Sequence, residues 1–181
     1  MSPQPILPDK PLSLWGFMGC GKSHWGERLS QYLDVPWMDL DRLVEQRAGM
    51  AVSEIFRRHG ETAFRELESE VLRQVLATEG HYVLSLGGGT PCFFDNAEQL
   101  RERTLSVYLK TEPALLAERL RLERANRPML SGWPEENWEE KLAELLHQRA
   151  TFYEKAEWYC PMERDFPTDA EAFLKSLCPF A

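Results

Sequence analysis

Residues 16–23 read GFMGCGKS, which fits the pattern G-x-x-x-x-G-K-[ST] of a phosphate-binding loop. The apolar stretch Leu12–Trp15 comes before this loop, and a helical pattern with Trp25 and Leu29 on one face follows it. A strand, a glycine-rich turn and a helix in this order are the context that the motif requires. The chain is therefore expected to contain an α/β unit that binds a nucleoside triphosphate.

The chemistry of such a loop gives each of its residues a role. The glycines let backbone N–H groups face the phosphates, and the helix that follows adds the positive end of its dipole. Lys22, expected on a solvent-facing loop, can reach the β- and γ-phosphates, and the Ser23 hydroxyl can ligate Mg²⁺. The predicted nucleotide-binding residues are Gly19, Cys20, Gly21, Lys22, Ser23 and His24. The alternative is a glycine-rich turn that contains Lys-Ser by chance.

The chain has 181 residues, of which 43% are apolar, and a formal net charge of −8. This length suits a single globular domain over residues 1–181. The acidic balance argues against a nucleic-acid-binding surface, which would need a basic stripe. No apolar run reaches the length of a membrane span and the N-terminus lacks a signal-peptide pattern, so a cytoplasmic location without a membrane partner is expected. Four prolines predict an extended tail at 1–11.

The cysteines have no C-x-x-C spacing, which favours reduced thiols over a disulfide framework or a zinc site: Cys20, Cys92, Cys160 and Cys178. Cys20 stands beside Lys22 in the phosphate loop, where its thiol could be acidified. The alternative, which we favour, is a small residue at an unconstrained loop position. The four histidines likewise show no metal-ligand spacing.

Strand-like and helix-like segments alternate along the chain, which predicts an α/β fold with a largely parallel sheet. Strands are expected at 12–16, 36–39, 82–86, 105–109 and near 158–160. Helices are expected at 22–33, 40–48, 53–58, 61–78, 96–101, 112–122, 136–156 and 169–177.

Four arginines stand close together just before a segment rich in Pro, Gly and Trp: Arg119, Arg121, Arg124 and Arg127. In an acidic protein this pattern favours a mobile lid over phosphates, at about residues 121–135. A solvated, charged helix end is the alternative.

The metal that accompanies the phosphates needs a carboxylate, and no acidic residue ends the strand expected at 82–86. Asp39 and Asp41 instead lie at the end of the second expected strand, two residues apart. In extended backbone, side chains at that spacing emerge on one side, and the carboxyl ends of parallel strands line the ligand crevice. The other interpretation is a helix N-cap followed by a first-turn carboxylate, and both can hold.

Three consecutive glycines, Gly87, Gly88 and Gly89, follow the third expected strand. Their cost in conformational entropy suggests that a ligand lies against bare backbone or that a positive φ is needed. A tight turn is the alternative.

Two arginines are expected to be partly buried. Arg149 lies at helical spacing from Leu142 and Leu146, whereas Arg65 has Glu61 at i−4 and Glu68 at i+3. A buried arginine needs an anionic partner, and a carboxylate substrate would provide one with bidentate geometry. An internal salt bridge is the alternative for Arg65.

Together these features resemble the shikimate kinase family over essentially the whole chain, from Leu12 to Cys178. The shared elements are, in order, GFMGCGKS at 16–23, WMDLD at 37–41, Ile55-Phe56, Gly60-Glu61, Phe64-Arg65, Glu68, the glycines at 87–89, RPML at 127–130, Arg149, Tyr153 and Ala156. The resemblance implies a three-layer α/β/α P-loop kinase fold, similar to nucleoside monophosphate kinases, with a five-stranded parallel sheet. It also implies ATP-dependent phosphorylation of the 3-hydroxyl of shikimate, a step of chorismate and aromatic amino acid biosynthesis.

The same resemblance implies how the nucleotide is held. Lys22 and Arg127 hold the transferred phosphoryl group, and Ser23 with Asp39, through water, holds Mg²⁺. The arginine near adenine is one of three: Arg119, Arg121 or Arg124.

For the acceptor, the resemblance implies that Asp41 binds the substrate hydroxyls and accepts the proton. Arg65 and Arg149 bind the carboxylate, and the glycines at 87–89 offer backbone contacts. The implied partners are shikimate and ATP, and a monomer is expected.

The departures from the family pattern are Cys20, His24 and Trp37, and none removes a functional group. The rival interpretations are another small-molecule kinase of similar fold, acting on gluconate or a nucleoside monophosphate, and a non-catalytic module that uses ATP as a switch.

Overall fold

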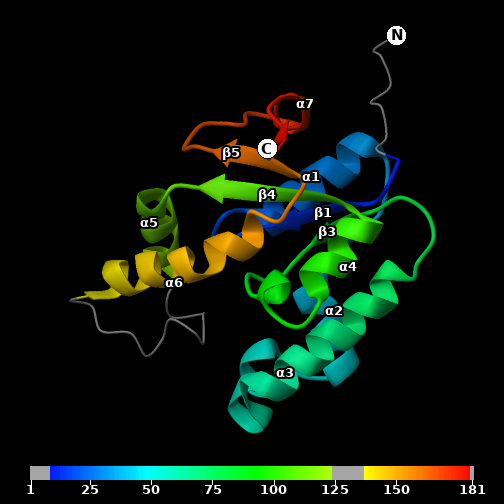
Figure 1. Cartoon of the computed structure of the whole chain (residues 1–181), viewed down its shortest axis with the longest axis vertical. Coiled ribbons are helices and arrows are strands. Elements are labelled where there is room, and N and C mark those ends of the chain that lie inside the picture. The colour runs from blue at the N-terminus through cyan, green and yellow to red at the C-terminus, as the bar shows by residue number, and fades with distance from the viewer. Residues whose placement is uncertain (1–8, 124–136, 180–181) are drawn as a thin grey trace.

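The computed structural model describes residues 9–123 and 137–179. Within them, six strands form a sheet in the order β2-β3-β1-β4-β5-β6 (Figure 1). Five strands run parallel, as predicted: β1 (Leu12–Trp15), β2 (Trp37–Asp39), β3 (Val83–Ser85), β4 (Leu105–Thr111) and β5 (Trp158–Met162). The expected five-stranded sheet gains a sixth strand, β6 (Cys178–Pro179), which pairs antiparallel with β5. Two residues, one of them proline, carry no alternating pattern from which this strand could be predicted.

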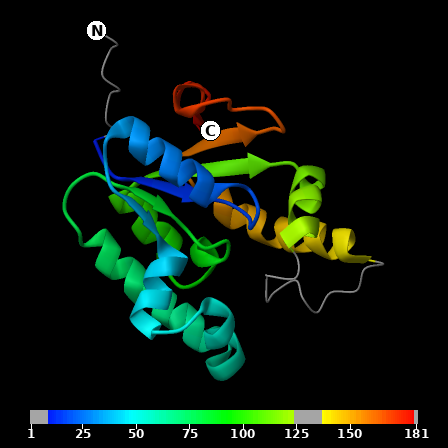
Figure 2. The same cartoon turned by 180° about the vertical axis from the view of Figure 1, so that it is seen from behind.

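Helices cover both faces of the sheet, which confirms the three-layer architecture (Figures 1 and 2). α1 (Lys22–Leu33) and α7 (Ala170–Lys175) pack together on one face, where the rings of Trp25 and Phe173 lie 5.0 Å apart. α4 (Asn96–Arg103) and α6 (Trp138–Tyr153) lie on the other face. The remaining helical elements are α2 (Leu40–Ala48), α3 (Val52–Leu76), the 3₁₀ turn η1 (Thr90–Cys92) and α5 (Pro113–Glu123).

The sequence predicts two helices at 53–58 and 61–78, and the structure confirms them as two helical segments that meet at a kink within α3. The kink lies at Gly60, where φ is 81° and ψ is 174°. A residue without Cβ adopts this conformation at little cost. The rings of Phe56 and Phe64, one from each side of the kink, pack with their centroids 4.6 Å apart. The kink therefore folds the first part of α3 back over the pocket described below.

The register of the sheet brings three chain turns to one edge. Asp39 of β2 lies opposite Ser85 of β3, and Ser85 lies opposite Leu14 of β1. Because the three strands are parallel, the segments that follow them leave the sheet side by side. These segments are the phosphate loop, the Asp39–Asp41 element and the three glycines.

Two of the sequence predictions lie outside the described residues. The expected tail at 1–11 is described only from residue 9, and the expected lid at 121–135 only up to residue 123, the end of α5. Arg124 and Arg127 belong to the segment that is left out. In the described part of the chain, no helix is long and apolar enough to cross a membrane.

Candidate active site

The phosphate loop has the expected form, but its lysine is buried. Gly16, Gly19 and Gly21 have φ of 138°, 78° and 101°, which only glycine adopts readily. The Lys22 ammonium donates hydrogen bonds of 2.8 Å to the carbonyl oxygens of Gly16 and Phe17. Its side chain is only 8% exposed, so the expectation of a solvent-facing residue is wrong. These hydrogen bonds hold the ammonium at the centre of the loop.

Strand β3 contacts the phosphate loop through Ser85. The Ser85 hydroxyl donates to the Lys22 carbonyl oxygen at 2.9 Å and accepts from Trp37 Nε1 at 3.0 Å. A Cβ on Gly26 would lie 2.3 Å from the Ser85 oxygen and 2.5 Å from Trp37 Nε1. Gly26 therefore leaves the space that Trp37, a departure from the family pattern, occupies.

Ser23 and Asp39 meet beside the loop. The Ser23 hydroxyl donates to Asp39 Oδ2 at 2.7 Å. The other Asp39 oxygen accepts from the backbone N–H of Arg42 at 3.3 Å and so caps α2. Both interpretations of Asp39, as an N-cap and as a residue of the crevice, therefore hold. A cavity of about 260 Å³ lies between these residues and the loop.

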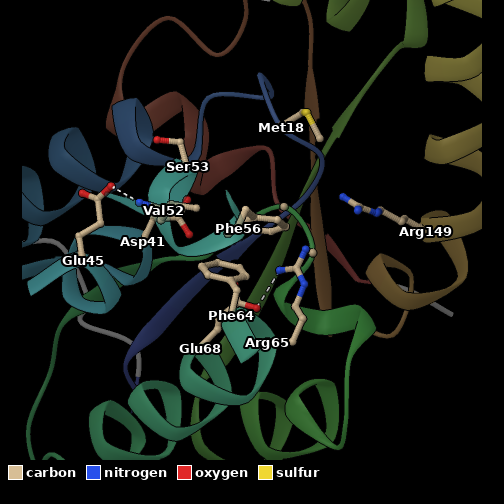
Figure 3. A pocket seen from close by; sticks show the side chains of 13 residues that line it. Met18, Asp41, Glu45, Val52, Ser53, Phe56, Phe64, Arg65, Glu68 and Arg149 are labelled. Atoms are coloured by element: carbon tan, nitrogen blue, oxygen red, sulfur yellow. Dashed lines mark hydrogen bonds and ion pairs between the residues drawn. The ribbon is translucent and has the colours of Figure 1, made fainter. Parts of the chain in front are cut away.

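A second cavity, the acceptor pocket, lies next to the first and has a volume of about 280 Å³ (Figure 3). It is lined by Met18, Asp41, Glu45, Val52, Ser53, Phe56, Phe64, Arg65, Glu68, Gly87, Gly88, Gly89 and Arg149. The two predicted arginines, Asp41 and the three glycines therefore meet in one place, although they are far apart in the sequence. Met18, Glu45 and the residues at the start of α3 also line the pocket and were not predicted from the sequence. The available signal was Phe56, which lies within the shared motif.

Arg65 extends from α3 and is fixed on several sides. Its guanidinium pairs with Glu61 at 3.1 Å and with Glu68 at 2.9 Å. The centroid of the Phe93 ring lies 4.4 Å from Arg65 Cζ, within the range of a cation–π contact. The internal salt bridge is thus present, and the guanidinium also lines the pocket.

Glu68 belongs to a buried polar network that the sequence did not reveal. It is fully buried and accepts a hydrogen bond of 2.6 Å from the Thr90 hydroxyl. The Thr90 carbonyl oxygen accepts from Asn96 Nδ2 at 3.0 Å, and the Ser69 hydroxyl donates to Asn96 Oδ1 at 2.7 Å. Buried and satisfied networks of this kind fix a unique geometry.

The glycines at 87–89 are required by close packing, because none of them has a positive φ. A Cβ on Gly87 would lie 2.7 Å from Glu68 Oε1, and one on Gly89 would lie 2.5 Å from Arg65 Nη2. The Thr90 N–H donates to the Gly87 carbonyl oxygen at 3.2 Å, so the segment also forms the turn that was the alternative. Because these glycines have no side chains, Glu68 and Arg65 can lie directly against the backbone.

Asp41 lies in the first turn of α2, two residues beyond the predicted strand end, and lines both cavities. Burial raises the pKa of Asp41 from 3.8 to about 6, and the negative charges of Glu68 and Asp39 act in the same direction. The positive charges of Lys22 and Arg65 oppose this shift. A carboxylate with a pKa near neutrality, next to a phosphate loop, is suited to accept a proton.

Arg149 reaches the acceptor pocket from α6, on the side away from α3 (Figure 3). Arg149 is only 7% exposed, as the sequence predicts for a side chain that points into the protein. Its Cζ lies 5.8 Å from the centroid of the Phe17 ring in the phosphate loop. Two guanidinium groups from separate helices therefore face one pocket.

A third cavity, of about 340 Å³, lies on the far side of the phosphate loop and is lined by Gly19, Cys20, Gly21, His24, Trp25, Arg28, Arg119 and residues 162–164 and 166–167. Arg119 Nη1 lies 3.5 Å from the Gly19 carbonyl oxygen. Arg121 instead pairs with Glu139 at 2.9 Å on the surface. Cys20 is fully buried, so it is a small residue as expected, but its position is constrained by packing and not unconstrained.

A phosphate loop beside a separate pocket with two arginines and a carboxylate defines the class: a P-loop kinase for a small anionic acceptor. The sequence profile described as "Shikimate kinase" matches residues 18–177 of the chain. This chain belongs to the shikimate kinase family.

Individual relatives agree with this assignment. The shikimate kinase of Bacteroides fragilis is 37% identical over 165 residues, which cover 91% of this chain and 92% of that protein. The crystal structure of shikimate kinase from Bacteroides thetaiotaomicron has a TM-score of 0.83, 35% identity, and coverage of 92% of this chain and 94% of that one. The structure of shikimate kinase from Acinetobacter baumannii in complex with shikimate has a TM-score of 0.80 at 33% identity, covering 94% and 90%.

Proposed function

We propose that this chain transfers the γ-phosphoryl group of ATP to the 3-hydroxyl of shikimate, giving ADP and shikimate 3-phosphate. As a member of the shikimate kinase family it is an ATP-dependent phosphotransferase of aromatic amino acid biosynthesis. The single observation that best supports this proposal is the position of Asp41. It lines both the acceptor pocket and the cavity beside the phosphate loop. A hydroxyl bound beside Asp41 would face the phosphate carried by the loop.

The acceptor roles follow from charge and geometry. Arg65 and Arg149 bind the carboxylate of shikimate from two sides, because both guanidinium groups line the pocket. Asp41 binds a hydroxyl on the ring, and the backbone of Gly88 is exposed to the substrate because it bears no side chain. The pocket volume of about 280 Å³ suits a six-membered ring acid with some remaining water.

The nucleotide roles use the other two cavities. The loop residues Gly19, Cys20, Gly21, Lys22, Ser23 and His24 hold the phosphates. Of the candidate arginines for the adenine side, we propose Arg119, because it lines the third cavity whereas Arg121 is paired on the surface. Arg127 lies outside the described residues, and its proposed role is to hold the transferred phosphoryl group from the lid.

The residues present fit Mg²⁺. The Ser23 hydroxyl oxygen and Asp39 Oδ2 lie 2.7 Å apart and could both act as oxygen ligands. Mg²⁺ prefers oxygen ligands from one or two protein groups together with phosphates. We propose that Ser23 ligates the ion and that Asp39 acts through water. When bound, the ion neutralises charge on the phosphates.

The transfer itself is then a matter of position and charge. The 3-hydroxyl oxygen forms a bond to the γ-phosphorus while the bond to the ADP oxygen breaks, and the hydroxyl proton passes to the Asp41 carboxylate. Lys22 stabilises the negative charge on the transferred group. Phosphoryl transfer needs mainly this positioning and charge stabilisation.

All residues of the proposed site come from one chain, so we propose that a monomer suffices. We also propose a cytoplasmic location, which is supported by four free thiols that suit a reducing compartment.

A coupled assay of ADP release tests the substrate. We expect ADP release with shikimate and little with quinate, gluconate or nucleoside monophosphates, because the pocket combines two arginines with a hydroxyl-binding carboxylate. Equal release with gluconate or a nucleotide would overturn the proposed acceptor. Release that does not depend on any added acceptor would favour an ATP-driven switch module.

Replacing Arg149 by lysine is expected to weaken shikimate binding by about 1–3 kcal/mol, because the charge stays but the planar fork is lost. Separate titrations with shikimate and ATP measure the effect, and the affinity for ATP should stay unchanged. Arg47→Lys is the matched control, since Arg47 pairs with Glu70 on the surface. Loss of ATP binding with intact shikimate binding would contradict the acceptor map.

The pH profile of kcat/KM for shikimate tests Asp41. Because the pKa of Asp41 is raised to about 6, the carboxylate form increases with pH around that value. Activity is therefore expected to fall as the pH decreases through about 6. Glu68→Gln removes a negative charge that raises this pKa, so its acid limb should move to lower pH. An acid limb that Glu68→Gln leaves in place would exclude Asp41 as the titrating group.

A further inference from the structure

Tyr153, the last residue of α6, connects that helix to the glycine segment of the acceptor pocket. The residue is fully buried, and its hydroxyl donates a hydrogen bond of 2.5 Å to the Gly88 carbonyl oxygen. The two residues are 65 positions apart in the sequence. The contact therefore fixes α6, which carries Arg149, against the backbone that lines the pocket.

Arg149 lies one helical turn before Tyr153 on the same face of α6. Burial raises the pKa of Tyr153 well above 10, whereas the charge of Arg149 and a hydrogen bond with its side chain act in the opposite direction. A tyrosine hydroxyl has one proton to donate and lone pairs that accept. It can therefore donate to Gly88 and accept from the Arg149 guanidinium at the same time.

Packing alone would not require the hydroxyl. The ring of Tyr153 packs on the ring of Tyr108 in β4 with centroids 5.2 Å apart, and a phenylalanine ring could fill the same space. A hydroxyl buried at this depth is costly unless it is hydrogen-bonded. Its hydrogen bond to Gly88, whose backbone lines the acceptor pocket, indicates a role for the oxygen itself.

We infer that Tyr153 is a positioning residue for the acceptor: through its hydrogen bond to the Gly88 carbonyl oxygen it fixes the end of α6, and with it Arg149, relative to the backbone that lines the pocket. On the opposite wall, Arg65 is held by Glu61 and Glu68. A carboxylate bound from two sides needs both guanidinium groups at a constant separation, and Tyr153 supplies the restraint on the α6 side. The inference rests on the proposed function, in which Arg149 binds the shikimate carboxylate.

Tyr153→Phe tests this inference, with Tyr82→Phe as the matched control. Tyr82 is also buried, and its hydroxyl donates to a backbone carbonyl, that of Val75, at 3.2 Å. Tyr82 adjoins β3 at the end opposite to the glycines, so it lies away from the pocket. Tyr153→Phe is expected to raise the KM for shikimate about 2- to 10-fold, as for loss of one neutral hydrogen bond that positions the binding residue. Its KM for ATP should stay unchanged, and its Tm should fall about as much as that of the control.

The double variant Tyr153→Phe/Arg149→Lys shows whether Tyr153 acts through Arg149. If it does, adding Tyr153→Phe to Arg149→Lys raises the KM for shikimate less than it does in the unmodified chain. If the increase in KM for the double variant equals the product of the increases for the two single variants, the inference is overturned.

Two failures can be told apart. If Arg149→Lys weakens shikimate binding but Tyr153→Phe behaves like Tyr82→Phe, the positioning role is wrong and the acceptor map stands. If neither Arg149→Lys nor Tyr153→Phe affects shikimate, the acceptor map itself is wrong, and the inference falls with it.

Discussion

Replacing Lys22 by methionine is expected to lower kcat by on the order of 10³-fold, because the ammonium that stabilises charge on the transferred phosphoryl group is lost. Methionine is unbranched, is close to lysine in length and can occupy the same space. The side chain is buried, however, and donates to two carbonyl oxygens, of Gly16 and Phe17. Carbonyls without a donor should reduce the free energy of unfolding by about 1–3 kcal/mol. Coupled turnover and thermal unfolding measure the two effects.

The affinity for shikimate distinguishes loss of chemistry from loss of the fold. Since the acceptor pocket does not include Lys22, a folded Lys22→Met variant should bind shikimate nearly as tightly as the unmodified chain. Lys155→Met removes an ammonium that pairs with Glu98 on the surface, and serves as the control for the charge. A Lys22→Met variant with a near-native rate would show that the phosphate-loop assignment is wrong.

The elements predicted best are those with local start and stop signals. The predicted bounds of α1 and α2 agree with the structure. α2 begins after a capping aspartate, Asp39, and ends at Ala48, before Gly49 with a φ of 65°. Such signals act over a few residues, so a single sequence contains them. The short strand β6 has no such signal, since its position depends on pairing with β5.

The candidate site was predictable where its residues follow strand ends. In a parallel sheet the segments after neighbouring strands meet at one edge, so Asp39, Asp41 and the glycines at 87–89 could be placed beside the phosphate loop. The contacts that fix these residues were not predictable. Thr90 and Glu68 are 22 positions apart, and no periodicity links them. The burial of Lys22 depends in the same way on the closed shape of its loop.

Asp41→Asn is expected to have the second large effect, and it separates function from stability. The amide keeps the shape of the side chain but cannot accept the hydroxyl proton, so kcat should fall by on the order of 10²- to 10⁴-fold. The affinity for ATP should remain close to that of the unmodified chain. Asp95→Asn is the control for replacing a carboxylate by an amide, because the exposed Asp95 carboxylate accepts a hydrogen bond from Gln99 on the surface.

The same substitution should stabilise the fold at neutral pH. The folded-state pKa of Asp41 is about 6, above its ordinary value of 3.8, so the folded chain binds the proton more tightly than the unfolded chain does. Stability from this group therefore falls as the pH rises from about 4 to about 6, and the ionised carboxylate disfavours the fold at pH 7. Asparagine carries no such charge, and the expected gain at pH 7 is about 3 kcal/mol.

Chemical unfolding of Asp41→Asn and of the unmodified chain between pH 3.5 and 7 measures this gain in the free energy of unfolding. Below about pH 4 the carboxyl is protonated in both states, so the pH-dependent difference between the variant and the unmodified chain should disappear there. A chain that loses turnover while it gains stability has given up an ionised group held for chemistry, since the fold itself favours the neutral form. Should Asp41→Asn destabilise the protein at pH 7 by the same amount as at pH 3.5, the raised pKa would be wrong. The role of Asp41 as proton acceptor would then lose its physical basis.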